Sequence, residues 1–567
     1  MSSTQPAPGA KTRRITRACD YCHRRAIRCL RDGNASQCLK CLQFSQPCTY
    51  ARPAKRRGVK PGSQAISPSA PANVLGNSRA KTDSQSRLQW TAPLIASQAV
   101  VLSLAEVYFE VVYPIFPFFH QPTYLRRIAR AEYTSDRHLF STTMALCALV
   151  SARVQDQALF NTSYDMEELT KVPCETFYEA AVQASVDVTT ETSIQSLDLL
   201  RTCALLSLTA VQCGKIRDMQ RFLGRYHTLV AMDRLQDESN WPTGIGIVET
   251  EERRRLFWSM YTFEIYVSIV WNSVTRVREQ QVNVAYTTEI DDELFSDRGY
   301  SSTLRPLVDL RQSPTSRPGQ VASTSWLCGW NFTTDLYRVL EHVIASFGNR
   351  KRHQGSFPME LFVNRSATSI SSVRDVVMQQ YTNLPYCFKV VSQLTCDPAS
   401  DRFGFQAANI TATVQLLRMM LFASGGGSIE DRCKIASEVI DAFTQIPVAY
   451  LRAISSPLLH HLAGIGSILG SVFEEPMSEH AYEQVRVVLL ALAQLLENLE
   501  HGIHATKSAQ RLRDLVAQID DYMNSQRDQS SNLPTKLANE IMDEWPWNLD
   551  FMQLAESWSS TEGQLDL

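Results

Sequence analysis

The sequence predicts a mostly α-helical protein in which a small cysteine-rich module precedes a large all-α domain. Six of the 14 cysteines lie close together, between positions 19 and 48. Residues 53–96 are rich in Ser, Pro, Ala, Gly and basic residues, a composition typical of a flexible linker. Beyond this linker, long segments repeat apolar residues with helical spacing, and no strand-like alternation of comparable length occurs.

The composition is that of a globular protein whose charge is unevenly distributed. The 567 residues are 44 % hydrophobic and 20 % charged, which allows a sizeable core and excludes wholesale disorder. Residues 1–60 carry 14 Lys and Arg against two acids, a net charge of +12, whereas the other 507 residues carry 42 bases and 56 acids, a net charge of −14. A basic N-terminal region on an acidic body indicates a polyanionic partner for that region. No secretory signal or membrane span is recognisable.

Apolar periodicity predicts two groups of helices in the large domain, separated by a long irregular loop at 296–325. No repeat of fixed period is visible, so we expect packed helices throughout 97–530. The expected helices are 97–113, 136–155, 174–188, 193–212, 216–234, 249–272, 326–350, 369–395, 403–423, 429–453, 457–474, 478–501 and 505–525.

The cysteine cluster consists of two near-identical halves with the spacing C-x2-C-x6-C-x8-C-x2-C-x6-C. Tetrahedral zinc takes four ligands, so six thiolates serve two Zn²⁺ ions only if two thiolates bridge. By the symmetry of the halves we expect Cys19 and Cys38 to bridge. No coordination position is left open, which predicts a structural rather than a hydrolytic site. The expected ligands are Cys19, Cys22, Cys29, Cys38, Cys41 and Cys48.

The runs ACDYCHRRAIRC and CLKCLQFSQPCTY resemble the fungal zinc cluster (Zn2Cys6 binuclear) DNA-binding domain, here assigned to 15–52 after a disordered basic tail at 1–14. The resemblance implies a short helix, capped by Asp20 and running to Arg28, that enters the major groove and reads a CGG-type triplet. By position, Arg25 is the residue implied to contact guanine. The residues implied to contact phosphates are Arg24, Arg28 and Lys40, with a phosphate contact or a plain surface role for His23.

Two features distinguish this sequence from the family pattern. Ala26 stands where the family usually has a basic residue that reads the triplet, and the loop LRDGNASQ lacks the proline commonly found there. Only Leu75 and Leu88 are leucines within 53–93, so no coiled-coil seam is available. A monomer and a homodimer formed through the helical body therefore both remain open.

The basic run after the cluster predicts phosphate tracking and nuclear import. A solvated linker is the alternative interpretation. The residues concerned are Arg52, Lys55, Arg56 and Arg57.

The helical body resembles the fungal-specific transcription factor domain, the middle homology region, over about 97–345. The segments that carry this resemblance are SLAEVYFEVVYPIFPFFHQPTYL, RFLGRYHTLVAMDRLQDE and ETEERRRLFWSMYTFEIYVSIVWN, followed by the acidic IDDELF. The resemblance implies a regulatory domain. Within the third segment we expect i,i+4 ion pairs Glu249–Arg253 and Glu251–Arg255. The eight cysteines of the body are expected to be buried, reduced thiols.

The C-terminal tail, 531–567, mixes acidic and apolar residues, with seven acids and no base from 540 onward. This composition is typical of transcriptional activation segments. A terminal amphipathic helix docked on the body is the alternative. The apolar anchors would be Trp545, Trp547, Leu549, Phe551, Met552, Leu554 and Trp558.

These features together predict a nuclear, sequence-specific RNA polymerase II transcription factor, an activator of a pathway-specific gene set. Its expected partners are double-stranded DNA with CGG-containing sites and coactivators, and no membrane. We lean towards a secondary-metabolite gene cluster as its target. A repressor or a regulator of nutrient catabolism is the alternative, and a metabolite-binding sensor with an accessory zinc module is the alternative of another class. GxSxG, HExxH and GxGxxG motifs are absent, so no enzyme is expected.

Overall fold

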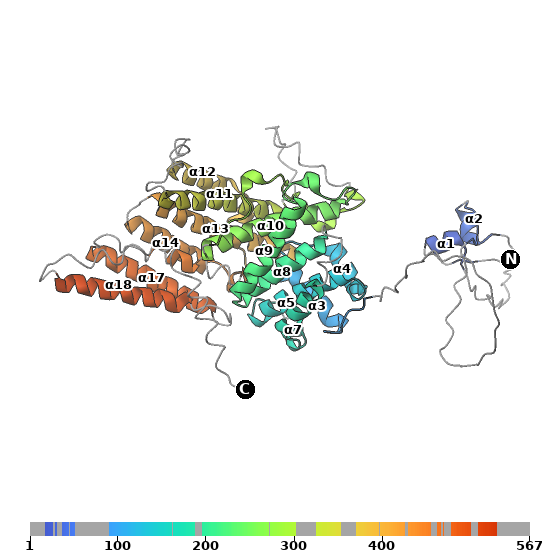
Figure 1. Ribbon diagram of the computed structural model, residues 1–567, viewed down its shortest axis with the longest axis horizontal. Coiled ribbons are helices and arrows are strands. Elements are labelled where there is room, and N and C mark those ends of the chain that lie inside the picture. The colour runs from blue at the N-terminus through green and yellow to red at the C-terminus, as the bar shows by residue number, and fades with distance from the viewer. Residues whose placement is uncertain are drawn as a thin grey trace, which may run out of the picture. The chain divides into compact units, whose positions relative to one another are not determined.

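The chain divides into two compact units, Met1–Ser86 and Arg87–Leu567, which Figure 1 shows in the computed structural model. The structure describes residues 18–25, 29–30, 37–44, 46–51, 90–161, 163–186, 196–271, 273–301, 325–352, 370–395, 397–425, 429–454, 462–466, 469, 478–500 and 508–529.

The described part of the N-terminal unit contains two short helices, each preceded by a cysteine. They are α1 (Asp20–Arg24) and α2 (Leu39–Gln43). The sulfur of the preceding cysteine caps each helix, because Cys19 Sγ accepts the Cys22 N–H at 3.5 Å and Cys38 Sγ accepts the Cys41 N–H at 3.4 Å. The two halves of the cysteine motif therefore repeat in structure as they do in sequence.

Asp20 does not cap α1, contrary to our expectation. Its carboxylate accepts the Ala51 N–H at 2.7 Å and the Thr49 hydroxyl at 2.9 Å, which ties the end of the module to its beginning. Cys19 occupies the capping position instead, and α1 ends at Arg24 rather than at Arg28, which lies outside the described residues.

The second unit is built from packed helices, and the predicted mostly α-helical fold class is confirmed. Among the described residues, one short antiparallel pair, β1 (Phe295–Ser296) with β2 (Gly299–Tyr300), is the only sheet. The helices in chain order are α3 (Gln98–Val111), α4 (Gln121–Ala129), η1 (Glu132–Thr134), α5 (Arg137–Gln155), α6 (Met166–Thr170), α7 (Cys174–Val186), α8 (Leu197–Gln212), α9 (Ile216–Asp233), η3 (Glu238–Asn240), α10 (Ile247–Trp271), η4 (Glu279–Gln281), η5 (Asp292–Leu294), α11 (Leu327–Arg352), α12 (Ile370–Asn383), η8 (Tyr386–Phe388), α13 (Pro398–Gly425), α14 (Ile429–Thr444), α15 (Val448–Ile454), α17 (Glu479–Glu500) and α18 (Ser508–Gln529).

Three helices form the centre of the first half of this unit. Every residue from Leu139 to Val154 of α5 is buried, and α8 and α10 are buried on nearly all sides. A helix that is apolar all round must be covered on all faces, and α3, α7 and α9 pack around these three. The second half continues the array through α11, α13 and α14 to the α17–α18 hairpin, and α10 joins the halves by packing on α11 (Figure 1).

Prolines divide two of the predicted helices. The segment 429–453 forms α14 and α15, because Pro447 lacks an amide hydrogen and disfavours a helical residue before it. Likewise α12 ends at Asn383, just before Pro385, so the predicted helix 369–395 is half as long as expected. The short helices α4 and α6 were not predicted. Most of 457–474 and of the loop 296–325 lies outside the described residues.

The helical unit begins before Ser97, within the predicted linker 53–96. Trp90 packs edge-on against Phe140 with ring centroids 5.4 Å apart, and the Ala92 N–H donates to the Thr134 carbonyl at 3.1 Å. Ser97 then caps α3 through its hydroxyl, which accepts the Val100 N–H at 3.2 Å. In the described part of the chain, no helix is both long and apolar enough to span a membrane.

The body cysteines are less uniformly buried than we expected. Cys213, Cys328 and Cys387 are only half-buried, which corrects the expectation that all eight are buried. The other described body cysteines, Cys147, Cys174, Cys203 and Cys433, are buried, and all seven are free thiols. Cys396 lies outside the described residues.

Candidate metal centre and nucleic-acid interface

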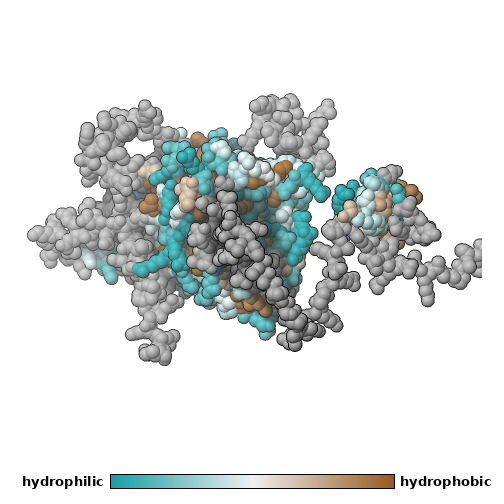
Figure 2. Space-filling view, turned by 45° about the vertical axis from the view of Figure 1, so that its right-hand side comes forward, coloured by the Kyte–Doolittle hydropathy of each residue, from teal (hydrophilic) through white to brown (hydrophobic). Residues whose placement is uncertain are grey.

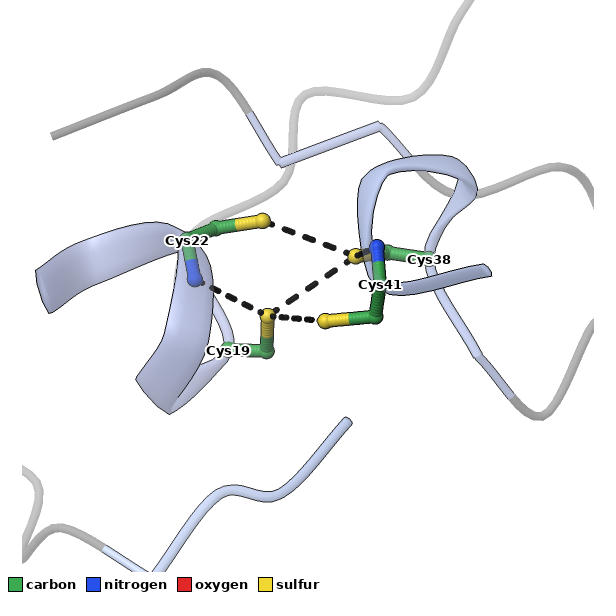
Figure 3. Close-up of side chains that lie close together, drawn as sticks. All are labelled: Cys19, Cys22, Cys38 and Cys41. Carbon is green, nitrogen blue, oxygen red and sulfur yellow. Dashed lines mark hydrogen bonds between the residues drawn. The ribbon is translucent and has the colours of Figure 1, made fainter. Parts of the chain in front are cut away.

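Four cysteine sulfurs converge between α1 and α2, as Figure 3 shows. The Sγ atoms of Cys19, Cys22, Cys38 and Cys41 all lie within 4.8 Å of one another, and the four side chains are buried. Zinc–sulfur bonds of about 2.3 Å in a tetrahedron place sulfurs about 3.8 Å apart, whereas a disulfide requires about 2.05 Å. The closest sulfur pairs here are 3.5 to 3.7 Å apart, so the cluster has the spacing of zinc ligands and not of disulfides.

Two of the sulfurs occupy the middle of the cluster. Cys19 Sγ lies 3.7 Å from Cys38 Sγ and 3.5 Å from Cys41 Sγ, and Cys38 Sγ also lies 3.6 Å from Cys22 Sγ. Each middle sulfur therefore contacts one outer sulfur, Cys38 contacting Cys22 and Cys19 contacting Cys41 (Figure 3). This arrangement fits two metal ions that share the middle pair and take one outer sulfur each.

The remaining two cysteines lie beside the same cluster. Cys29 is buried within it and Cys48 packs against it, with Cys48 Sγ accepting the Cys38 N–H at 3.5 Å. Burial raises the pKa of the Cys29 thiol, and its contacts with the thiols of Cys38 and Cys19 add to the rise. Each half of the motif thus adds its second and third sulfurs to the shared middle pair. Each of the two ions then has four sulfurs, Cys19 and Cys38 with Cys22 and Cys29 for one ion, and Cys19 and Cys38 with Cys41 and Cys48 for the other.

Hydrogen bonds distinguish the middle sulfurs from the outer ones. Burial alone would raise the pKa of every thiol here. Bonds from backbone N–H groups and neighbouring thiols outweigh burial at Cys38, whose pKa falls to about 6, and they also lower the pKa of Cys19. The pKa values of Cys22 and Cys41 rise because these thiols are buried and share hydrogen bonds with the middle pair.

The donor set fits zinc and leaves no room for catalysis at the metal. Six thiols without a carboxylate or a free ligand position match a closed structural site, and soft thiolates select zinc over hard cations. The binuclear domain binds two zinc ions, which supply cross-links between the two halves.

The basic residues next to the cluster are open to solvent. His23, Arg24 and Arg25 are exposed at the end of α1 and just after it. Lys40 is half-buried on α2, and its ammonium donates to Gln43 Oε1 at 3.0 Å. The other predicted DNA contacts, Arg28, Arg52, Lys55, Arg56 and Arg57, lie outside the described residues, as do Trp545, Trp547, Leu549, Phe551, Met552, Leu554 and Trp558 of the tail.

Sequence reasoning missed that the same unit exposes apolar side chains. Leu30, Leu39, Leu42 and Phe44 are between 38 % and 66 % exposed. Figure 2 shows hydrophobic patches on this unit among hydrophilic ones. The spacing of Leu39 and Leu42 on a short helix was the only sequence signal for this surface.

The three consecutive arginines of α10 each have a carboxylate partner, but one predicted partner was wrong. Arg253 pairs with Glu249 at 2.6 Å, as expected. Arg255 instead pairs with Asp292 at 2.7 Å, and both side chains are almost completely buried. Glu251, the expected partner of Arg255, accepts from Arg254 at 3.0 Å. Arg255 points into the core, where the acidic segment after α10 meets it.

Family comparisons agree with both parts of this description. Residues 17–57 match the fungal Zn(2)-Cys(6) binuclear cluster domain, and residues 105–346 match the fungal specific transcription factor domain. The chain therefore matches both kinds of domain, a binuclear metal module followed by a helical middle homology domain, as the sequence predicted.

Curated relatives of the chain are activators or regulatory proteins by name. It is 21 % identical to the transcriptional activator protein acu-15 of Neurospora crassa over 320 residues, 56 % of this chain and 30 % of the relative. It is 27 % identical to the maltose fermentation regulatory protein MAL33 of Saccharomyces cerevisiae over 141 residues, 25 % of this chain and 28 % of the relative. The quinic acid utilization activator of Emericella nidulans is 36 % identical over 61 residues, 11 % of this chain and 7 % of the relative. The chain thus spans less than a third of each relative.

Proposed function

We propose that this zinc cluster protein is a nuclear, sequence-specific DNA-binding transcription factor that binds CGG-containing sites. The observation that carries the proposal is the pairing of a closed sulfur cluster with an exposed basic helix end directly beside it. The two matched domains and the names of the relatives support the same class of function. We do not assign an enzymatic activity.

The basic residues would take two different roles, contact with a base and contact with phosphates. The zinc-held cluster would fix the position of α1, so that its exposed end enters the major groove. There Arg25 would donate two hydrogen bonds to O6 and N7 of a guanine. Arg24, Arg28 and Lys40 would contact phosphates, as would the basic run Arg52, Lys55, Arg56 and Arg57, which we also propose as the nuclear import signal.

Selection of binding sites from random duplex DNA by the zinc-loaded full chain tests this proposal. Enrichment of a CGG-type triplet supports it, and the absence of any enriched sequence contradicts it. A single triplet would indicate that a monomer binds, whereas two triplets at fixed spacing would indicate a homodimer. Because no coiled-coil seam follows the cluster, such a dimer would form through the helical body.

Replacing Arg25 with alanine is expected to remove sequence discrimination. A bidentate arginine–guanine contact contributes about 1–3 kcal/mol of discrimination, so specific binding should weaken by about fivefold to 150-fold while binding to random duplex changes little. Arg24→Ala is the matched control, since Arg24 is the neighbouring residue, at the end of α1, and is also exposed. The Arg24→Ala variant should bind both duplexes more weakly. The slope of the logarithm of its binding constant against the logarithm of the salt concentration should fall by about one in magnitude. Equal losses on both duplexes for Arg25→Ala would contradict the assignment.

We further propose that the tail, 531–567, is an activation segment that recruits coactivators. Deleting it should reduce reporter output several-fold while leaving DNA binding by the truncated chain unchanged. A matched truncation of the basic tail, 1–14, should preserve output. Reporter output that rises on deletion of 531–567 would instead indicate a repressor.

The pathway under control is a separate proposal. We expected a secondary-metabolite gene cluster from the compact layout of the chain. Two relatives are named for maltose fermentation and for quinic acid utilization, and these names favour regulation of nutrient catabolism. Genome-wide mapping of bound promoters distinguishes the two proposals.

A further inference from the structure

Two cysteines of the helical unit bring their sulfurs into contact, far from the zinc cluster in sequence. Cys174 Sγ and Cys213 Sγ lie 3.7 Å apart, although 39 residues separate them in the chain. Cys174 is the first residue of α7, and Cys213 caps the C-terminal end of α8. Because α7 and α8 pack against each other, folding of the domain places the two thiols together.

The distance between the sulfurs is within reach of a covalent bond. A disulfide joins its sulfurs at about 2.05 Å, so the two atoms need to approach by about 1.7 Å. Both residues lie at helix ends, where rotation of the side chains can supply much of this approach without separating the packed helices. The pair is therefore already close to the geometry that oxidation would produce.

The two thiols differ in exposure and in acidity. Cys174 is 2 % exposed, whereas Cys213 is half-buried, and both line a small depression together with Lys215 and Tyr178. The hydrogen bond between the two thiols lowers the pKa of Cys213, and the Lys215 ammonium lowers it further. The same hydrogen bond, together with burial, raises the pKa of Cys174. Since the thiolate is the nucleophile, Cys213 is the reactive member and Cys174 the protected one.

We propose that Cys174 and Cys213 form a peroxide-sensitive dithiol site that closes to an intramolecular disulfide. The Cys213 thiolate attacks one oxygen of hydrogen peroxide, the O–O bond breaks, and the departing hydroxide takes up a proton to give water. Cys213 is then a sulfenic acid. The sulfur of Cys174 attacks the sulfur of Cys213, the S–O bond breaks, and the leaving hydroxide takes the proton of the Cys174 thiol. Two thiols thereby lose two electrons and two protons, and one peroxide becomes two waters.

The disulfide would link the start of α7 to the corner between α8 and α9. A thiol reductant would restore both cysteines by thiol–disulfide exchange. This inference concerns the helical domain alone and holds whatever DNA sequence the protein binds.

Peptide mapping of the full zinc-loaded chain tests the site directly. The reduced protein is treated with hydrogen peroxide, its free thiols are blocked with iodoacetamide, and it is digested without reductant. We expect a cross-linked pair of peptides containing Cys174 and Cys213, lighter than the two reduced peptides by two hydrogen atoms and absent after dithiothreitol. Peptides from the zinc cluster have their own masses in the peptide map. Oxidation of the cluster cysteines therefore does not obscure the cross-link between Cys174 and Cys213.

Single substitutions assign the roles of the two thiols. In Cys174→Ser, Cys213 should stop at the sulfenic acid and be trapped by dimedone, whereas in Cys213→Ser, Cys174 should stay reduced. Cys387→Ser is the matched control, because Cys387 is also half-buried but has a pKa raised by burial, and this variant should keep the cross-link. The wild-type map does not depend on the folding of any variant. If both cysteines stay alkylatable in the wild type, or if Cys387 oxidises as fast as Cys213, the proposal is wrong.

Discussion

In a Cys38→Ala variant, both zinc ions are expected to be lost and the N-terminal unit is expected to unfold. Cys38 Sγ lies in the middle of the cluster, 3.7 Å from Cys19 Sγ and 3.6 Å from Cys22 Sγ, where two ions would share it. Its removal would take one ligand from each ion. So small a module has little other core, and structural zinc contributes on the order of 10 kcal/mol to its folding. Zinc content per chain and binding to specific duplex DNA should both fall to background.

The matched control is Cys22→Ala, which removes an outer sulfur from the same cluster. Cys22 would be an outer ligand of one ion only, so this variant should damage one ion site and leave the other with four sulfurs. We expect about one zinc per chain after dialysis against a weak chelator, measured by mass spectrometry of the metal. Retention of one tightly held zinc in Cys38→Ala would contradict the bridging role and favour separate ligand sets.

The metal module could be predicted from the sequence because its ligands are close together in the chain. The cysteine spacing alone determines which sulfurs can meet, and the structure places Cys19, Cys22, Cys38 and Cys41 together as that spacing requires. Long helices such as α5 and α10 could also be predicted, because helices buried on most sides carry long apolar runs in the sequence. In both cases the decisive information lies within about 30 residues of sequence.

The features that sequence reasoning missed all depend on where a side chain points after packing. An i,i+4 rule assigns Glu251 to Arg255, but Arg255 turns into the core and reaches Asp292, 37 residues further on. Asp20 was expected to cap a helix at its own position, yet it binds Thr49 and Ala51. The contact between Cys174 and Cys213 likewise follows from the packing of α7 on α8, for which no local pattern exists.

The Arg255–Asp292 pair is a buried link between α10 and the segment that follows it. Besides the 2.7 Å contact with Arg255, the Asp292 carboxylate accepts the Tyr113 hydroxyl at 2.6 Å and the Gln121 N–H at 2.7 Å. Burial alone would raise the pKa of Asp292, but the Arg255 guanidinium, with further help from His120 and these hydrogen bonds, lowers it. The carboxylate therefore stays charged and joins three separate parts of the domain.

Replacing Asp292 with asparagine is expected to destabilise the helical unit strongly. The amide would leave the Arg255 guanidinium buried without its counter-charge, and breaking a buried pair in this way costs about 3–5 kcal/mol. Asp375→Asn is the matched control, because Asp375 forms an exposed pair with Arg374 at 3.1 Å and such pairs contribute about 0–1 kcal/mol. Urea unfolding of the full chain, followed by circular dichroism of the helices, measures both changes. A loss in Asp292→Asn no larger than the loss in Asp375→Asn would show that the buried pair contributes nothing.

The same variant has a distinct pH signature. Since the pKa of Asp292 is lower in the folded state than in the unfolded chain, its contribution to stability is present above the unfolded value of about 3.9 and disappears as the pH falls through the folded value. The wild type should therefore lose stability on acidification more steeply than Asp292→Asn, and the difference between the two should shrink towards low pH. Unfolding free energies measured from neutral to acidic pH would give parallel curves if the pKa of Asp292 were the same in the folded and unfolded chains, and converging curves if Asp292 is the charged partner of Arg255.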